Sequence, residues 1–287
     1  MQNLNSVTLA LISNYPKWYR GKIQSIKHTQ KVRGDLALEM INVSVKKGIE
    51  VIIADGPSSK SFKKELKKIP GIIIANRRSF KRSPAKRVGF KIASRLKDVK
   101  AIISAEAEKV SLISDCLEQV VEPILKNEAD IVIPKREEGL FSKTYPAYMV
   151  ESEQEGNKLY NEYLKTEGFM ERSQEDFDFF FGARIIKNDP KVLRLFTKRF
   201  RIKVGNLDVA KEFLDPEELS NATYFPLVLA LKKNLKVKSV TVPFSYPKLQ
   251  KENEEVLAKA YFIEKRRSQR LSLLLELIHF LQYLKKY

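Results

Sequence analysis

Two glutamates follow a short apolar run in the middle of the chain. Residues 101–103 are apolar, and Glu106 and Glu108 come shortly after them, separated by one residue. Residues two apart in a strand point to the same side, so both carboxylates would leave the strand end together. They would repel each other unless a positive charge lies between them, and Mg²⁺ and Mn²⁺ favour carboxylate and phosphate oxygens. The pattern predicts a divalent-metal site, and the alternative is a solvated acidic turn.

Strand-like and helix-like segments alternate in the first half of the chain. We expect strands over residues 7–13, 49–54, 72–75, 101–103 and 129–134, and helices over residues 33–47, 61–68, 83–96 and 110–126. The strands are continuous apolar runs, which is typical of strands buried on both faces of a parallel sheet. The sequence therefore predicts an α/β fold in which a mostly parallel sheet lies between helices.

Polar side chains stand at the ends of these strands, where open parallel sheets bind their ligands. The positions singled out are Asn14, Tyr15, Asp55, Glu106, Glu108 and Arg136. Asn14 and Tyr15 either line a pocket or simply end the first strand. Asp55 precedes Gly56, and this pair either contacts a ligand or only forms a turn, because both residue types favour turns.

The composition is that of a basic globular protein. The chain has 287 residues and a net charge of +18, which attracts phosphorylated substrates, anionic membrane surfaces or nucleic acid. A single cysteine excludes an internal disulfide and fits a reducing compartment, and two histidines make a structural zinc site unexpected. We expect no signal peptide and no bilayer-spanning segment, because the N-terminus and the apolar runs lack the required pattern.

The end of the chain is expected to form a helical extension, over residues 251–287, of a domain that spans residues 1–250. Leucines are frequent over residues 271–284, and basic residues lie on both sides of this stretch. The pattern predicts either an amphipathic helix on an anionic membrane surface or a helix that docks on the domain or in a dimer contact. The basic run over residues 265–270 favours a solvated or lipid-facing patch.

The order of these features resembles the nucleotide-sugar glycosyltransferases of the GT-A fold, especially family 2. The resemblance covers roughly residues 5–250 and rests on a strand that ends in Asp55, a basic stretch, the acidic pair and a strand that ends in Arg136. It implies a Rossmann-like domain that moves a sugar from a nucleotide-diphosphate-sugar donor to an acceptor. It further implies that Asp55 contacts the base and that Arg87 and Arg136 support donor binding. Glu106 and Glu108 would hold Mg²⁺ or Mn²⁺.

The chain departs from the family at two places. Glu-x-Glu replaces the family's Asp-x-Asp, so each carboxylate has one more rotatable bond. The family's later Glu-Asp pair, whose aspartate often serves as the catalytic base, has no counterpart in residues 220–226. The base then comes from elsewhere, with Asp176 and Asp178 as substitutes, or the enzyme retains configuration and needs no such base, or activity is lost.

Three hypotheses about function are compatible with these features. The main one is a cytoplasmic or membrane-peripheral glycosyltransferase with an unidentified acceptor, for which nucleic acid is not an expected partner. A nucleotidyltransferase can share this half-sheet and acidic metal site, although residues 14–18 lack a Gly-rich phosphate loop. The third is a non-catalytic basic protein on a degenerate transferase scaffold, which would bind nucleic acid or anionic lipid and would lose nucleic acid steeply with salt.

Overall fold

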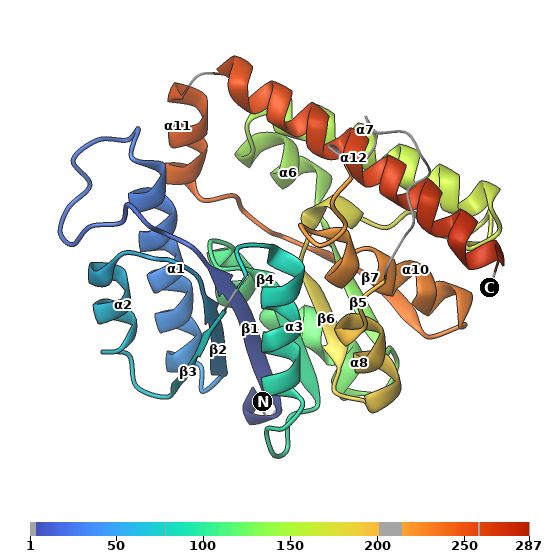
Figure 1. Ribbon diagram of the computed structural model, residues 1–287, viewed down its shortest axis with the longest axis horizontal. Helices are drawn as coiled ribbons and strands as arrows, with labels where there is room; N and C mark the ends of the chain where they lie inside the picture. The colour runs from blue at the N-terminus through green and yellow to red at the C-terminus, as the bar shows by residue number, and fades with distance from the viewer. Residues whose placement is uncertain (1–3, 78, 201–213, 258, 287) are drawn as a thin grey trace.

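A computed structural model describes residues 4–77, 79–200, 214–257 and 259–286 (Figure 1). Within these residues, seven strands form one sheet in the order β3-β2-β1-β4-β6-β5-β7. The strands are β1 (Val7–Ser13), β2 (Glu50–Asp55), β3 (Ile72–Asn76), β4 (Ala101–Glu106), β5 (Ile131–Arg136), β6 (Arg184–Lys187) and β7 (Val237–Val242). β6 runs antiparallel to β4 and β5, and the other pairs are parallel. The predicted α/β class with a mostly parallel sheet is confirmed.

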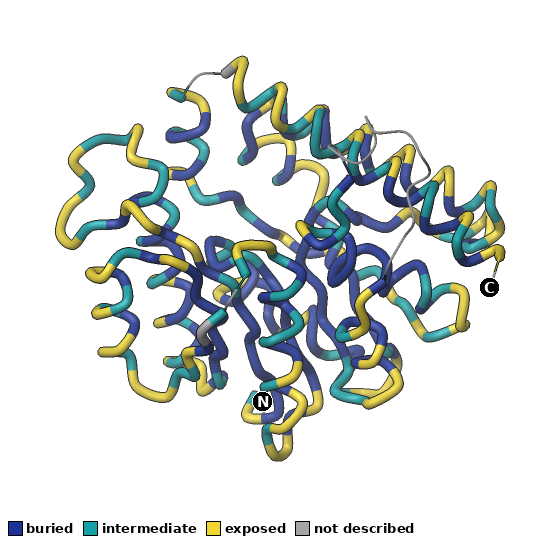
Figure 2. The backbone as a smooth tube through the Cα atoms, in the orientation of Figure 1, coloured by how far each residue is buried: buried dark blue, intermediate teal, exposed yellow. Residues whose placement is uncertain are grey.

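Helices cover both faces of the sheet, and a separate hydrophobic core lies under each layer. The first core contains side chains of α1 (Thr29–Lys46), α2 (Lys60–Leu66), α4 (Val110–Ser114) and α5 (Leu117–Leu125). The second contains side chains of α3 (Arg82–Ala93), α7 (Ala147–Thr166), α8 (Pro190–Thr197), α10 (Phe225–Lys232) and α12 (Lys259–Lys286). Leu9 and Leu11 of β1 face the first core, whereas Ala10 faces the second, because successive strand residues point to opposite faces. Figure 2 shows the resulting buried centre.

The order in which strands are added to the sheet reverses at β1: β2 and β3 lie on one side of it and β4 lies on the other. β1 pairs with β2 on one side and with β4 on the other, and β3 lies beyond β2. Ser13 is in register with Asp55, and Ile12 is in register with Glu106. The switch point between β1 and β4, where such sheets bind ligands, therefore lies beside the two predicted glutamates.

Residues 176–186 are rich in aromatic side chains and form two short elements on either side of Gly182. Residues Phe179–Phe181 form the 3₁₀ helix η2, whose last N–H group is bonded by the side chain of Asp178, and Arg184–Lys187 form β6. Gly182 joins them with a φ of 82°, in the left-handed region that glycine adopts readily. The turn at Gly182 therefore separates the 3₁₀ helix from β6.

Within the described residues, the remaining short helices are η1 (Leu4–Ser6), α6 (Glu138–Thr144), η3 (Ser220–Ala222) and α11 (Lys248–Val256). α12 lies along α7 and buries Leu277, Phe280 and Leu281 in the second core, so its apolar face is docked on the domain (Figure 1). Leu271 and Leu275 stay exposed on its outer side. In the part of the chain that the structure describes, no helix has the length and apolarity needed to cross a membrane.

Candidate active site

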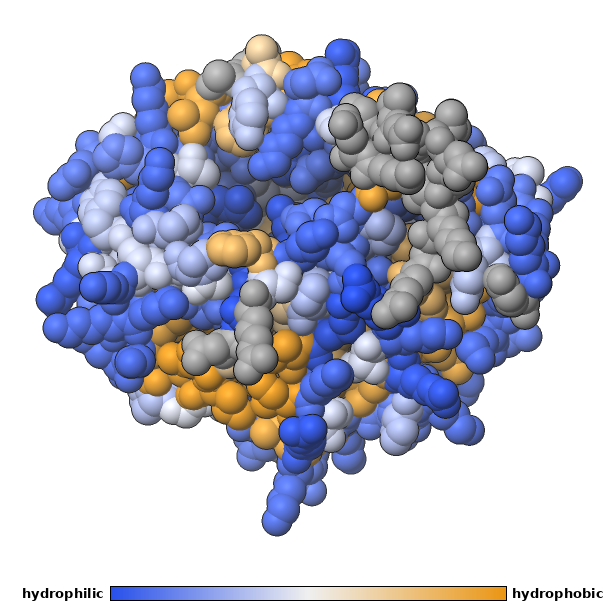
Figure 3. Space-filling view, viewed as in Figure 1, coloured by the Kyte–Doolittle hydropathy of each residue, from blue (hydrophilic) through white to orange (hydrophobic). Residues whose placement is uncertain are grey.

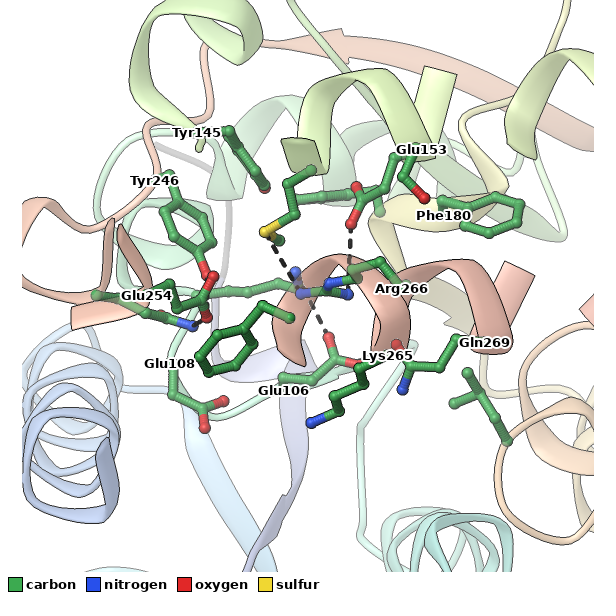
Figure 4. Close-up of a pocket in the computed structure, with 18 of the residues that line it drawn as sticks. Glu106, Glu108, Tyr145, Glu153, Phe180, Tyr246, Glu254, Lys265, Arg266 and Gln269 are labelled. Carbon is green, nitrogen blue, oxygen red and sulfur yellow. Dashed lines mark hydrogen bonds and ion pairs between the residues drawn. The ribbon is translucent and has the colours of Figure 1, made fainter. Parts of the chain in front are cut away.

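A pocket of about 360 Å³ opens at the carboxyl ends of β4 and β5. Its lining comes from the ends of β4 and β5, from the turn at Gly182, and from α1, α7, α11 and α12. Figure 4 shows charged and aromatic side chains from these elements facing one another. In Figure 3, hydrophilic side chains dominate the middle of this face of the molecule. The extension predicted for residues 251–287 therefore contributes directly to the pocket of the main domain.

Glu106, the last residue of β4, is held ionised in this pocket. Burial opposes the charge, but Lys109 and Lys86 outweigh it and lower the pKa of Glu106 to about 2. Lys109 Nζ lies 3.6 Å from Glu106 Oε2, an oxygen that is buried and accepts no hydrogen bond within the described structure. A Cβ atom at Gly182 would lie 3.2 Å from Glu106 Oε1, so a glycine there leaves room for the carboxylate. Glu106 thus has an ionised oxygen free for a ligand.

Glu108 is buried and is engaged by two partners. Its Oε1 accepts a hydrogen bond from Tyr15 Oη at 3.0 Å and lies 2.8 Å from Nε of Arg33 on α1. Burial, followed by the negative charge of Glu108, raises the pKa of Tyr15 well above its usual value, so the phenol stays protonated and donates. In Figure 4 the carboxylates of Glu106 and Glu108 lie apart and point in different directions.

The donor set fits a divalent cation at Glu106 and not between the two glutamates. Each glutamate faces one cation, Lys109 at 3.6 Å from Glu106 and Arg33 at 2.8 Å from Glu108, but only Glu106 keeps a buried oxygen that accepts no hydrogen bond within the described structure. The described residues contain no group of three or more His, Cys, Asp or Glu side chains arranged to hold a metal. A cation at Glu106 would therefore need further oxygen ligands from a bound phosphate and from water.

Asp55 lies at the end of β2, behind the pocket lining. Its Oδ1 accepts hydrogen bonds from Ser13 Oγ at 2.7 Å and from Ser58 Oγ at 2.6 Å. Lys63 Nζ lies 3.7 Å from its Oδ2. Asn14 is exposed just after β1. Neither Asp55 nor Asn14 lines the pocket, although both lie at the same edge of the sheet.

Arg136 at the end of β5 is enclosed by partners. It donates from Nε and Nη2 to Asp178 at 2.7 Å each and from Nη1 to Glu153 at 2.6 Å, and its guanidinium carbon lies 3.8 Å from the ring centre of Phe141. Burial opposes the ionisation of Asp178, but the charge of Arg136 outweighs it and lowers the pKa of Asp178. Arg136 thereby ties β5 to η2 and α7 at the rim of the pocket.

Two other predicted residues lie away from the pocket. Arg87 pairs with Glu217 at 2.5 Å, on the segment before η3. Asp176 is on the surface and pairs with Lys165 at 2.7 Å. Asp176 and Asp178, the substitutes for a catalytic base, are both absent from the pocket lining.

Glu254 on α11 is a pocket carboxylate that no sequence motif indicates. Its Oε1 accepts hydrogen bonds from Tyr246 Oη at 3.0 Å and Gln250 Nε2 at 3.3 Å, and its Oε2 accepts one from Tyr148 Oη at 3.4 Å. The donors are all uncharged, and no ion pair of Glu254 is found among the described residues. Figure 4 shows Glu254 beside Tyr246 at one side of the pocket.

Basic side chains from helices complete the pocket. Arg33 comes from α1, Arg82 from α3, and Lys265, Arg266 and Arg270 from α12. Part of the basic run over residues 265–270 thus faces the pocket, in place of the solvated or lipid-facing patch that its composition favours. Residues 265, 266, 269 and 270 share one helical face, and this spacing is the signal in the sequence that part of the run faces inward.

Comparisons with known proteins find no matching family model and no matching curated protein. Among solved structures, the chain is similar to glucosyl-3-phosphoglycerate synthase from Mycobacterium tuberculosis in complex with Mn²⁺, UDP and phosphoglyceric acid, at 9% identity over 92% of this chain and 78% of that chain, with a TM-score of 0.46. It is also similar to 4-diphosphocytidyl-2C-methyl-D-erythritol synthase from Anaerococcus prevotii, at 14% identity over 90% of this chain and 99% of that chain, with a TM-score of 0.45. Residues 1–349 of S. aureus TarS match at 10% identity over 82% of this chain and 58% of that chain, with a TM-score of 0.42. Likeness at this level assigns no reaction, so the function is argued from the site.

Proposed function

We propose that this chain is a glycosyltransferase of the GT-A type, which moves a sugar from a nucleotide-diphosphate-sugar donor to an acceptor. The observation that carries the proposal is the ionised oxygen of Glu106, without a hydrogen-bond donor, in a cation-lined pocket at the switch point of the sheet. A departing nucleoside diphosphate gains negative charge, and a pocket of preorganised cations stabilises that charge as it forms.

Lys109 and Arg82 are the side chains proposed to receive the diphosphate. Both line the pocket, and Lys109 lies close to Glu106 in the chain segment that follows β4. Lys109 Nζ lies 4.5 Å from the ring centre of Phe181 and keeps its position against that aromatic face. These contacts would hold the donor with its leaving group toward the strand ends.

Glu106 is proposed to hold a divalent cation when one takes part. Such a cation would neutralise the leaving diphosphate and act as a template for its oxygens. The role proposed for Glu108 differs from the one that the family resemblance implies. Glu108 is proposed to orient Tyr15 and Arg33 beside the carboxyl end of β1.

Glu254 is proposed as the residue that takes the proton of the acceptor hydroxyl. Its hydrogen-bond donors are uncharged and it forms no ion pair within the described structure, in contrast to Glu153 and Asp178, which both pair with Arg136. A carboxylate within reach of the nucleophile can act as a general base.

Thermal stability in the presence of nucleotides and nucleotide sugars, measured with Mg²⁺, with Mn²⁺ and with EDTA, tests the donor class. A ligand that binds only the folded chain raises its apparent stability. We expect one diphosphonucleotide family to raise the melting temperature, and to do so more strongly with a divalent cation. A shift with nucleoside triphosphates alone would favour a nucleotidyltransferase, and no shift with any nucleotide would reject both enzymes.

A further inference from the structure

The pocket contains more positive than negative side chains. Seven cationic residues line it against four carboxylates: Arg33, Arg82, Lys109, Arg136, Lys265, Arg266 and Arg270 against Glu106, Glu108, Glu153 and Glu254. Such an excess inside a partly enclosed cavity favours an anionic ligand.

Five of the seven cations have a carboxylate of their own. The pairs are Arg33 with Glu108, Arg82 with Glu218, Lys109 with Glu106, Arg136 with Asp178 and Arg270 with Glu155. The remaining two, Lys265 and Arg266, are adjacent on α12. The two cations without a carboxylate of their own therefore lie side by side on one wall of the pocket. Burial there opposes the charge of Arg266, but the charges of Glu153 and Glu254 outweigh it and raise the pKa of Arg266.

Arg266 shares a carboxylate that is already in use. Its Nη1 lies 3.6 Å from Glu153 Oε1, while Glu153 Oε2 accepts a hydrogen bond from Arg136 at 2.6 Å. Its Nη2 contacts the sulfur of Met149, at 3.4 Å. One carboxylate thus faces two guanidinium groups. Among the described residues, the Nη2 group of Arg266 donates only to a thioether sulfur, which is a weak acceptor.

Lys265 has no ion pair or hydrogen bond within the described structure. Partial burial, followed by the positive charges of Arg33, Arg266 and Arg82, lowers the pKa of Lys265. In Figure 4 its ammonium group extends from α12 into the pocket, below Glu106. An anion bound at this wall would relieve the repulsion among these groups.

We infer that Lys265 and Arg266 bind an oxyanion, a phosphate or carboxylate, that belongs to the acceptor. Arg266 contacts Met149 and Glu153 of α7, whereas the expected donor residues Tyr15 and Asp55 lie at the ends of β1 and β2. The guanidinium fork suits two oxygens of one oxyanion, and the ammonium group adds a point charge. The assignment to the acceptor rests on the proposed function, whereas the oxyanion site itself does not.

Calorimetric titration of the full chain with inorganic phosphate tests the site, both without nucleotide and with a saturating nucleoside diphosphate. The variants are Lys265→Gln and Arg266→Gln, and the control is Arg267→Gln, an exposed neighbour of the same charge that does not line the pocket. We expect phosphate to bind about tenfold more weakly to each variant, as the loss of one charge-assisted hydrogen bond predicts, and unchanged to the control. Nucleotide binding should remain within about twofold in all of them.

Part of the Lys265 side chain stays in contact with solvent, so Lys265→Gln tests the site even if Arg266→Gln fails to fold. The site is rejected if wild type shows no saturable phosphate binding, or if Lys265→Gln binds phosphate as wild type does. If the nucleotide displaces phosphate and Lys265→Gln weakens both equally, the anion is the donor's diphosphate and the acceptor assignment is wrong. If no nucleotide binds while the variants still lose phosphate, the oxyanion site stands and the transferase proposal fails.

Discussion

Glu106 and Glu108 are separated by one residue, yet their surroundings differ. Glu106 keeps a buried oxygen without a hydrogen-bond donor, while Glu108 is bonded to Tyr15 and paired with Arg33. We predict that Glu106→Gln abolishes the effect of Mg²⁺ or Mn²⁺ on donor binding and also lowers stability near neutral pH, because the charges of Lys109 and Lys86 favour the ionised carboxylate in the folded chain. Donor affinity measured with each cation and with EDTA checks this.

Glu108→Gln is the matched variant for Glu106→Gln. It would leave Arg33 in the pocket wall without its carboxylate, so we expect lower stability and a retained metal effect on donor binding. If both variants lost the metal effect equally, the result would support one metal site that Glu106 and Glu108 share.

Glu254 gives a second prediction at this scale. Glu254→Gln keeps the size of the side chain, and its one amide oxygen can still accept the hydrogen bond from Tyr246 while its amide nitrogen faces Tyr148, but it cannot take a proton. We expect kcat to fall by about 10²- to 10⁴-fold, which is the usual contribution of a general base, with donor affinity unchanged. An unaltered kcat would remove Glu254 from the mechanism.

Individual side chains were predictable from the sequence only as positions at strand ends. Asp55, Glu106, Glu108 and Arg136 all lie at the edge of the sheet where strand order placed them. Their partners were not predictable, because they come from distant segments: Asp178, which binds Arg136, is 42 residues away in the chain. Glu254 carried no signal, since an acidic residue on a polar helix is ordinary.

At the scale of elements, α12 joins the pocket wall to the second core. Leu277, Phe280 and Leu281 are buried, and Glu276 lies among them and accepts a hydrogen bond from Ser220 of η3. The helix itself was predictable from its leucines, whereas the face that docks was not, because apolar residues lie around much of its circumference.

Glu276 makes the docking of α12 sensitive to pH. Burial raises its pKa from 4.5 to about 7, against the effect of the Ser220 hydrogen bond. The folded chain then binds more protons than the unfolded chain between these two pH values, so stability falls as pH rises through this window and levels off above it. Glu276→Gln should be more stable at pH 8 by up to about 3 kcal/mol.

Urea unfolding of wild type and Glu276→Gln between pH 5 and 8 measures this difference. The two stability curves should diverge as pH rises toward 7 and then run parallel. Curves that stay parallel throughout would show that Glu276 is ionised in the folded chain across the whole range.

At the scale of the whole molecule, we still predict a membrane-peripheral protein. The net charge of +18 and the exposed Leu271 and Leu275 of α12 favour contact with an anionic membrane surface. Sedimentation with anionic vesicles should carry the chain down, less so at high salt and less so for a Leu271→Ser/Leu275→Ser variant. Vesicle binding unaffected by this double substitution would mean that the outer side of α12 is not the contact.

The pocket is proposed, above all, to transfer a sugar and to release a nucleoside diphosphate. Phosphorus NMR during incubation of the chain with each nucleotide sugar, an extract of small metabolites as the acceptor source and Mg²⁺ or Mn²⁺ observes this directly. We expect loss of the donor's diphosphate diester signal and the appearance of a nucleoside diphosphate with a terminal phosphate, in wild type and not in Glu254→Gln. Pyrophosphate released from a nucleoside triphosphate and a sugar phosphate, with no consumption of any nucleotide sugar, would contradict the proposed reaction.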